Sequence, residues 1–335
     1  MIKSEIIGVG YYLPDNVVSN SDLESKMDTS DDWIKERTGI EERRWVKSGS
    51  KLTTSLMGTY AAQDALLNAK ISKDDIDFIV FATLSPDYYF PGSGVLLQRN
   101  LKIKEIGALD IRNQCSGFIY ALSVADQYIK SGMYKNILVV GSEIHSGGLD
   151  KTSRGRGVSV IFGDGAGAVI VQANKNSNSG ILSTHLHSEG KYAEELIVKN
   201  PSTNYWIDKI IDGKDQDDPS YFPYMNGNFV FKNAVLRFEE VIMEALNYNN
   251  LTKEDISLLI PHQANLRISK FIQNRLKLSN DKVYNNIMKY GNTTAASIPI
   301  ALKEALLNNK LKKGDVLCLA AFGSGFTWAS ALIKW

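Results

Sequence analysis

The sequence is poor in cysteine, has no long apolar run and shows no excess of one charge. Its only two cysteines exclude a disulfide framework and favour a reducing compartment. No stretch approaches the ~18 apolar residues that a membrane-spanning helix needs. The opening MIKSEIIGVGYYLP turns polar too soon to predict a signal peptide. The net charge of +1 does not favour binding to nucleic acid or to a membrane. From the cysteine content, the N-terminus and the lack of a spanning stretch, we expect a cytoplasmic protein.

Hydrophobic periodicity predicts an α/β protein. Apolar runs at residues 4–12 and 76–82 indicate strands, and the spacing over 29–40 and 54–69 indicates helices. Such alternation predicts a parallel sheet that is covered by helices. With 335 residues, the chain can form two domains or one large unit.

The chain also contains an internal repeat. KDDIDFIV at 73–80 returns as KEDISLLI at 253–260, KNILVV at 135–140 as GDVLCL at 314–319, and FGDG at 162–165 as FGSG at 322–325. The matches predict two copies of one α/β unit, at 1–175 and 176–335, the first with roughly 20 extra residues near 142–161. Because no linker rich in proline, serine or glycine separates them, we expect the copies to pack tightly.

Cys115 lies at an expected strand-to-helix turn. In the stretch DIRNQCSGFIYAL at 110–122, an apolar strand ends in a polar break, and a helical pattern follows the cysteine. The first N–H groups of a helix lack partners and carry positive potential, which favours the nucleophilic thiolate. The alternative is that Cys115 is a small buried hydrophobe.

The repeat aligns two further side chains with Cys115. Asn113-Gln114-Cys115 corresponds to Asn292-Thr293-Thr294, and each triplet is expected to open a helix after a strand. His262 follows the strand of the second copy that corresponds to 76–82. We therefore expect Cys115, His262 and Asn292 at one centre. The set suits either a papain-type hydrolase or a site that forms a thioester on cysteine and holds an enolate with two neutral donors.

Other patterns carry less chemistry. His185 and His187 are expected on one face of a strand, and no spacing predicts a metal site. The glycines at 163, 165 and 167 precede a strand-like run, which does not favour nucleotide binding. Between 262 and 282, five basic residues accompany one acid, which indicates a solvated helix face or a surface for an acidic partner.

The chain as a whole resembles the thiolase-like condensing enzymes, most closely the beta-ketoacyl-acyl-carrier-protein synthase III family. The motifs that carry the resemblance are TSDDWIKERTGI, CSGFIYALSVADQYI, FGDGAGAVIV, THLHSEG, MNGNFVFKNAV, PHQANLRI, YGNTTAASIP and FGSGFTWASAL. The resemblance implies an α/β thiolase-like fold, with duplicated halves in five αβαβα layers, and a homodimer. It also implies that an acyl-CoA primer condenses with malonyl-acyl-carrier protein, giving 3-oxoacyl-carrier protein, coenzyme A and CO2 at the start of fatty-acid synthesis, without a cofactor.

The resemblance assigns roles to individual residues. Cys115 would accept the acyl group, His262 and Asn292 would bind the malonyl thioester carbonyl, and the N–H groups of Cys115 and Ser324 would form the oxyanion hole. Trp33 and Arg156 would hold the adenine of coenzyme A. The remaining assignments are a coenzyme A tunnel lined by Arg37, Gly227, Asn228 and Asn265, and a carrier-protein surface made by Gln263, Ala264, Asn265, Leu266 and Arg267, with Arg267 as main contact.

Three segments depart from the family pattern. Arg112-Asn113-Gln114 stand where relatives commonly have small residues, 204–224 resembles a lengthened charged loop, and 87–90 lie where the partner subunit usually shapes the acyl pocket. These departures leave open a specialised condensing enzyme or an acyltransferase that uses longer or branched acyl groups. A cysteine hydrolase and an inactive binding module are less favoured.

Overall fold

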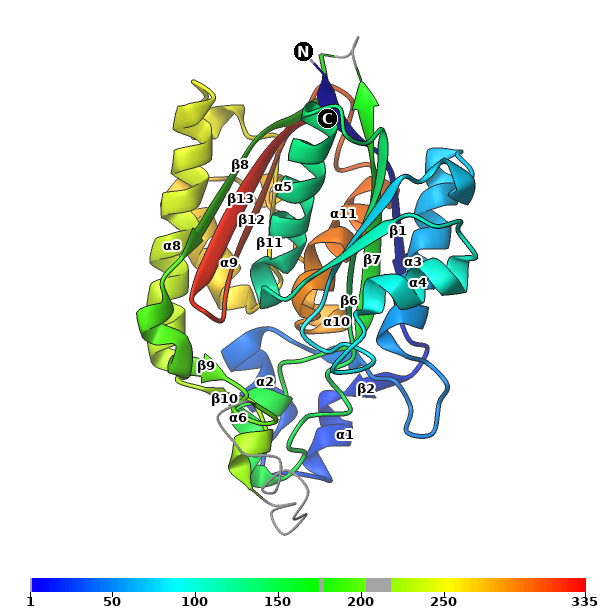
Figure 1. The fold of residues 1–335 in the computed structure, drawn as a ribbon. Helices are drawn as coiled ribbons and strands as arrows, with labels where there is room; N and C mark the ends of the chain where they lie inside the picture. Colours follow the sequence, from blue (N-terminus) through cyan, green and yellow to red (C-terminus); the bar gives the residue numbers. More distant parts are fainter. Residues whose placement is uncertain (1, 175–177, 203–217) are drawn as a thin grey trace.

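The protein forms five layers, two sheets alternating with three layers of helices (Figure 1). The computed structural model describes residues 2–174, 178–202 and 218–335. The first sheet contains β1 (Lys3–Tyr12), β7 (Gly165–Asn174), β6 (Asn136–Glu143), β4 (Phe78–Ala82) and β5 (Gly107–Ile111), in that spatial order. The second contains β8 (Gly180–Ser188), β13 (Thr327–Lys334), β12 (Val316–Gly323) and β11 (Leu258–Pro261).

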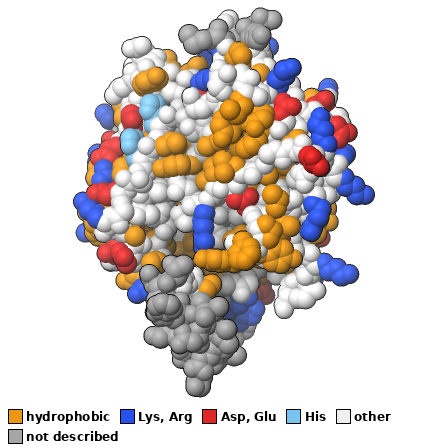
Figure 2. Space-filling model, in the orientation of Figure 1, with side chains coloured by type: hydrophobic (Ala, Val, Ile, Leu, Met, Phe, Trp, Pro, Cys, Tyr) orange, Lys and Arg blue, Asp and Glu red, His pale blue; other side chains and the backbone are white. Residues whose placement is uncertain are grey.

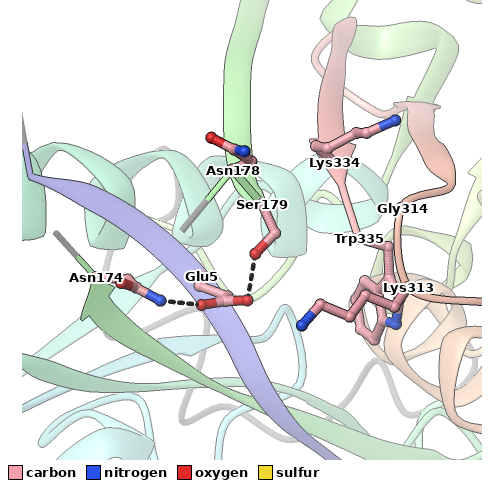
Figure 3. Close-up of a pocket in the computed structure, with 8 residues that line it drawn as sticks. All are labelled: Glu5, Asn174, Asn178, Ser179, Lys313, Gly314, Lys334 and Trp335. Carbon is pink, nitrogen blue, oxygen red and sulfur yellow. Dashed lines mark hydrogen bonds between the residues drawn. The ribbon is translucent and has the colours of Figure 1, made fainter. Parts of the chain in front are cut away.

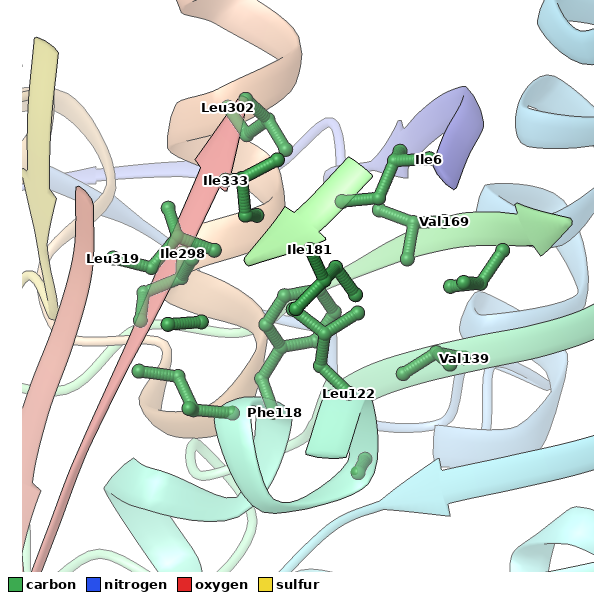
Figure 4. Packing of buried hydrophobic residues seen from close by; sticks show 14 of the residues in the cluster. Ile6, Phe118, Leu122, Val139, Val169, Ile181, Ile298, Leu302, Leu319 and Ile333 are labelled. Carbon is green, nitrogen blue, oxygen red and sulfur yellow. The ribbon is translucent and has the colours of Figure 1, made fainter. Parts of the chain in front are cut away.

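Helices fill the other three layers. The central layer is made of α5 (Gly117–Lys130) and α11 (Ser297–Leu307), each preceded by a short 3-10 helix, η2 (Gln114–Ser116) or η8 (Thr294–Ala296). The outer face of the first sheet carries α3 (Thr54–Ala69) and α4 (Ser93–Leu101), and that of the second carries α8 (Gly227–Tyr248) and α9 (Leu266–Leu276). Apolar side chains from α5, α11 and the inner faces of both sheets form one continuous core (Figure 4).

Smaller elements form a cap over one end of the sheets. They are β2 (Val17–Ser19), α1 (Asn20–Glu24), α2 (Asp31–Thr38), β3 (Glu42–Arg44), η3 (Ser153–Gly155), α6 (Arg156–Ser159), β9 (Leu196–Ile197), η5 (Pro219–Tyr221), β10 (Tyr224–Met225) and α10 (Ile287–Tyr290). The remaining short 3-10 helices are η1 (Lys73–Asp75), η4 (Gly190–Glu195), η6 (Lys253–Asp255) and η7 (Asn280–Lys282).

The two sheets repeat one topology. Strands β1, β7, β6 and β4 follow the same order and relative directions as β8, β13, β12 and β11. The capped turns η1 and η6 occupy corresponding places, each with a capping box. The second copy reduces β5 to a single bridge between Leu259 and Val283. The boundary predicted between the two copies, at 175–176, falls in the connection between β7 and β8.

The prediction of a parallel sheet is wrong for part of each sheet. β4 is parallel to its neighbours β5 and β6, but β7 runs antiparallel to β6 and to β1, and β13 runs antiparallel to β12 and to β8. In the second copy the cause is a hairpin of a few residues, which can join only antiparallel strands. In the first copy the same connection holds the extra residues, which build η3 and α6 of the cap.

The two central turns correspond with a shift of one residue from the predicted alignment. Gln114 and Thr294 each begin the 3-10 helix of their copy and have positive φ angles of 43° and 48°. Cys115 therefore corresponds to Ala295 rather than to Thr294. The strand predicted before Asn292 is also absent from the described chain, where α10 and one backbone bridge from Asn292 to Phe162 precede the turn.

Candidate active site

Cys115 lies in η2, pressed against the end of β12. A Cβ atom at Gly323 would lie 2.5 Å from Cys115 Cβ and 2.8 Å from its Sγ, so only glycine leaves room for the thiol. The backbone N–H groups of Ser324 and of Cys115 itself act to lower the pKa of the thiol and so favour its charged form. These are the two groups that the resemblance assigns to the oxyanion hole. The turn after β12 thus brings the predicted donors and the predicted nucleophile together.

Burial opposes the thiolate that the helix terminus is expected to favour. The pKa of Cys115 is raised to about 12, mainly by burial and in smaller part by Glu143, and the two N–H groups only partly offset this rise. The helix terminus favours the thiolate, but Cys115 is only 8% exposed, and the desolvation of its sulfur favours the neutral thiol more strongly. Cys115 is therefore a neutral thiol until a substrate arrives.

His262 is a buried, neutral imidazole whose tautomer is set by Ser297. Its Nδ1 atom lies 2.7 Å from Ser297 Oγ, which also accepts the N–H of Gln263 at 3.4 Å. Because the Gln263 N–H already donates to Ser297 Oγ, and Nδ1 is the other hydrogen-bond partner of this hydroxyl among the described residues, we infer that the hydroxyl donates to Nδ1 and that the imidazole proton is on Nε2. Nε2 is buried and has no partner in the described chain. Burial lowers the pKa of His262 to about 3, so Nε2–H is a neutral donor.

Asn292 is held at both its backbone and its side chain. Its N–H donates to Ile161 at 2.8 Å and its carbonyl accepts the N–H of Gly163 at 3.0 Å. Its side-chain Oδ1 accepts the N–H of Thr294 at 2.8 Å. Because the oxygen of the carboxamide is occupied, its NH2 group is the part left to meet a substrate.

The two halves bring these groups to one region. Gly117, at the start of α5, faces Ala295 of η8, with a hypothetical Cβ 3.6 Å from the Ala295 Cβ. A Cβ at Gly141 of β6 would lie 2.4 Å from the Ala295 carbonyl oxygen, so a glycine there lets η8 approach the first sheet. Ser297, the partner of His262, follows η8 directly. The turn of Cys115, the turn after Asn292 and the imidazole therefore adjoin one another.

Sequence reasoning missed three buried polar residues around this centre. Glu143, at the end of β6, accepts hydrogen bonds from Thr83, Leu84 and Ser85, and burial raises its pKa to about 7. His145 lies 2.7 Å from Thr294 Oγ1, and Ser297 orients His262. Glu143 was detectable as a charge at the end of the apolar run ILVVGSE, but nothing local marks His145 or Ser297.

The predicted coenzyme A residues gather in the cap. The guanidinium carbons of Arg156 and Arg37 lie 5.0 Å and 4.8 Å from the centre of the Trp33 ring. Asn265 caps α9 and donates from Nδ2 to the Arg37 carbonyl at 3.0 Å. Gly227 and Asn228 open α8, two and three residues after Met225, which packs on the same apolar cluster as Trp33.

The predicted carrier-protein surface divides into buried and exposed residues. Gln263 is 3% exposed, and its amide bonds to the backbone of Pro261, Tyr284, Asn286 and Ile287, so its side chain is not available for docking. Ala264, Asn265 and Leu266 are half-buried. Arg267 is exposed and lies 5.8 Å from the Phe231 ring.

Features outside the centre do not compete with it. His185 and His187 share the two carboxylate oxygens of Glu244, at 3.2 and 2.6 Å, as expected for one strand face. A cavity of about 550 Å³ lies at the opposite end of β12 and is lined by Glu5, Asn174, Asn178, Ser179, Lys313, Gly314, Lys334 and Trp335 (Figure 3). Within the described ranges, no helix combines the length and the apolar character that crossing a membrane requires.

Duplicated halves that enclose a cysteine, a neutral histidine and a carboxamide define a thiolase-like condensing enzyme. Family models described as 3-oxoacyl-(acyl-carrier-protein) synthase III and as the C-terminal part of that enzyme match residues 109–190 and 246–335. The chain belongs to this family.

Full-length relatives agree with the family models. The chain is 45% identical over 331 residues to beta-ketoacyl-(acyl-carrier-protein) synthase III of Yersinia pseudotuberculosis, covering 99% of both chains. The Aliivibrio fischeri enzyme of the same name is 44% identical over the same length and coverage. The crystal structure of 3-oxoacyl-(acyl-carrier-protein) synthase III from Aquifex aeolicus superposes with a TM-score of 0.90 at 44% identity, covering 99% of this chain and 100% of that one.

Proposed function

We propose that the chain performs the condensation of its family through an acyl group carried on Cys115. An acyl-CoA primer reacts first, and the Cys115 sulfur attacks its thioester carbonyl. The N–H groups of Cys115 and Ser324 stabilise the oxyanion, the acyl–sulfur bond to coenzyme A breaks, and the thiol proton passes to the departing coenzyme A sulfur. The observation that carries this step is the close contact of Cys115 with Gly323, which places the sulfur beside the N–H group of Ser324, the next residue.

In the second half-reaction, His262 and Asn292 stabilise an enolate. Malonyl-carrier protein places its thioester carbonyl against His262 Nε2–H and the Asn292 NH2 group. Loss of CO2 leaves the electron pair on the enolate, whose carbon attacks the acyl group on Cys115. The Cys115 thiolate then leaves, takes up a proton, and 3-oxoacyl-carrier protein departs. Decarboxylation generates the nucleophile, so the reaction as proposed needs neither a strong base nor a cofactor.

The two donors favour condensation over hydrolysis. A cysteine hydrolase uses its histidine as a base with a proton-accepting nitrogen toward the sulfur. Here the free nitrogen of His262 carries the proton, and its low pKa opposes protonation. The full-length relatives at 44–45% identity likewise favour chain initiation over a specialised acyltransferase.

Coenzyme A is proposed to enter at the cap. An adenine that binds between Trp33 and Arg156 must displace the guanidinium, which lies on the ring and also bonds to Asp28. A purine ring stacks favourably between an indole on one face and a guanidinium on the other. Arg37 and Asn265 stand beside this site, with Gly227 and Asn228 at the nearby start of α8.

The carrier protein is proposed to dock on α9. Arg267 and Lys270 are exposed next to the half-buried Phe231 and the exposed Phe271, whereas Arg275 is engaged by Glu239 at 2.6 Å. Exposed cations beside aromatic rings suit an acidic partner with an apolar contact. Arg267 is the main contact in this proposal.

We further propose a cytoplasmic homodimer. β5 is the free edge of the first sheet, and the side chains of Tyr88, Tyr89, Phe90, Val95 and Leu109 are exposed next to it. Figure 2 shows apolar side chains gathered on the face that carries α4 and β5. A second copy pairing along β5 would cover both the edge and these side chains. The two buried, free cysteines fit a reducing compartment.

The decisive experiment separates the two half-reactions. We expect Cys115→Ala to decarboxylate malonyl-carrier protein but to form neither an acyl adduct nor a 3-oxoacyl product, because His262 and Asn292 remain. Intact-protein mass spectrometry after incubation with a panel of acyl-CoAs measures the adduct, and release of CO2 measures decarboxylation. Condensation at the normal rate by Cys115→Ala, or an adduct on the wild-type protein that only hydrolyses, would refute the proposal.

A further inference from the structure

We propose that His145 is a positioning residue that aims the carboxamide of Asn292. This inference rests on the proposed function, because Asn292 matters only if it holds the enolate. His145 lies in the segment after β6 and is 8% exposed. It has no part in the mechanism above, yet both supports of Asn292 converge on it.

The first support runs through the side chain of Thr294. His145 Nε2 lies 2.7 Å from Thr294 Oγ1, and the Thr294 N–H donates to Asn292 Oδ1 at 2.8 Å. Thr294 has a φ angle of 48°, a left-handed conformation that is unfavourable for a β-branched residue. A partner for its hydroxyl therefore helps to keep the N–H directed at Asn292.

The second support runs through the backbone of Phe162. The imidazole of His145 packs on the Phe162 ring, with ring centres 4.6 Å apart. Phe162 forms the backbone bridge to Asn292, and its neighbours Ile161 and Gly163 make the two hydrogen bonds that hold the Asn292 main chain. One imidazole thus touches the residue that orients the carboxamide and the residue that flanks its backbone.

His145 is itself fixed in place. The backbone N–H of His145 donates to Asp164 Oδ1 at 2.7 Å, and the carboxylate of Asp164 also accepts hydrogen bonds from Ser146 and Val46. Burial lowers the pKa of His145 to about 3, so the imidazole is neutral. A rigid neutral ring is suited to positioning a neighbour but carries no charge into the site.

The test compares two amides that differ only in reach. His145→Gln places an amide group near the position of Nε2 and should keep at least half of the decarboxylation rate, whereas His145→Asn reaches only the position of Nδ1. We expect His145→Asn and His145→Leu to lower kcat for malonyl decarboxylation about tenfold, because small misplacements of a catalytic group are costly. KM and the rate of Cys115 acylation should change less than twofold. His187→Asn, on an exposed strand face, is the matched control and should change neither half-reaction.

Coupling to Thr294 makes the test specific. Thr294→Val removes the hydroxyl but keeps the branched shape, so it should lower decarboxylation, though by no more than His145→Leu, which also changes the packing on Phe162. The double variant should lose no more than His145→Leu alone, since both substitutions remove the same hydrogen bond. Multiplying losses, equal losses in both half-reactions, or no effect of His145→Leu would overturn the positioning role. If the wild-type protein itself fails to decarboxylate malonyl-carrier protein, the proposed function fails instead.

Discussion

A single hydroxyl decides whether His262 can donate or must accept. Ser297 Oγ lies 2.7 Å from Nδ1, and with the hydroxyl donating there the proton is on Nε2, which is buried and has no partner among the residues that the structure describes. An imidazole with the opposite tautomer would present a lone pair to the developing enolate oxygen, which is repulsive. The role proposed for His262 therefore depends on a residue outside direct contact with substrate.

Replacing Ser297 should expose this dependence. In Ser297→Ala, Nδ1 loses its donor and the tautomers mix, so we expect decarboxylation of malonyl-carrier protein to fall about tenfold, less than the roughly 10²–10³-fold cost of removing an oxyanion donor altogether. The rate of Cys115 acylation should change little. Ser330→Ala is the control, because Ser330 is equally buried but bonds to the Val241 carbonyl away from the site. A similar loss in both half-reactions would argue against the tautomer explanation.

The sequence could indicate Cys115, His262 and Asn292 but not the residues that orient them. The three were found because the repeat and the family motifs mark their positions. Ser297 lies in the family motif YGNTTAASIP and His145 in the string SEIHS, but neither string indicates an orienting role, which depends on partners 35 and 149 positions away. The neutral state of Cys115 was also beyond the sequence, since burial depends on the packing of β12 against η2.

At the level of elements, the site depends on close approach between a strand end and a turn. Gly323 ends β12 directly under Cys115, and Gly141 in β6 admits the carbonyl of Ala295. Both contacts lie where the copies meet, so glycine at these positions lets the central turns come together. Neither contact requires an unusual φ angle; the absence of a side chain is what matters.

Gly323→Ala should therefore damage both stability and acylation. The added methyl group would lie 2.5 Å from Cys115 Cβ, and the turn must move to relieve the clash. We expect a loss of about 1–3 kcal/mol in the free energy of unfolding, as for other overpacked cores, measured by chemical denaturation. Acylation of Cys115 should slow at least tenfold because the N–H of Ser324 moves with it. Gly190→Ala, where a Cβ meets nothing within 4 Å, should be neutral in both assays.

Elements were more predictable than their directions. The strand predicted at 4–12 is β1, and the helix predicted at 54–69 is α3 with the same bounds. Direction failed at β7 and β13 because apolar runs look alike in parallel and antiparallel strands, and only the connection distinguishes them. The charged loop predicted over 204–224 lies largely outside the described residues.

On the scale of the whole molecule, duplication explains where the buried charges lie. Each copy contributes one face of a central region from which water is excluded, so titratable groups there are desolvated together. His145 and His262 have pKa values lowered to about 3, and Glu143 has a pKa raised to about 7. Burial is the largest cause in all three, so each group favours its neutral form.

These shifts link stability to pH with opposite signs. Between about pH 3 and pH 6.5, the unfolded chain binds more protons at His145 and His262 than the folded chain does, so their contribution is lost as pH falls through that window. Between about pH 4.5 and pH 7, the folded chain binds more protons at Glu143, so its contribution grows as pH falls.

Two variants should separate these contributions. On going from pH 7 to pH 5, each histidine should cost about 2 kcal/mol of unfolding free energy and Glu143 should return about as much, so the wild-type protein loses stability overall. In His145→Leu the loss over this interval should shrink, because one destabilising protonation is gone. In Glu143→Gln the loss of stability from pH 7 to pH 5 should grow, because the stabilising protonation of Glu143 is gone. Urea titrations of the three proteins at both pH values measure the difference. A shift in the same direction for both variants would show that these groups are not neutral in the folded protein, since burial of a neutral histidine and a neutral glutamic acid must act with opposite sign.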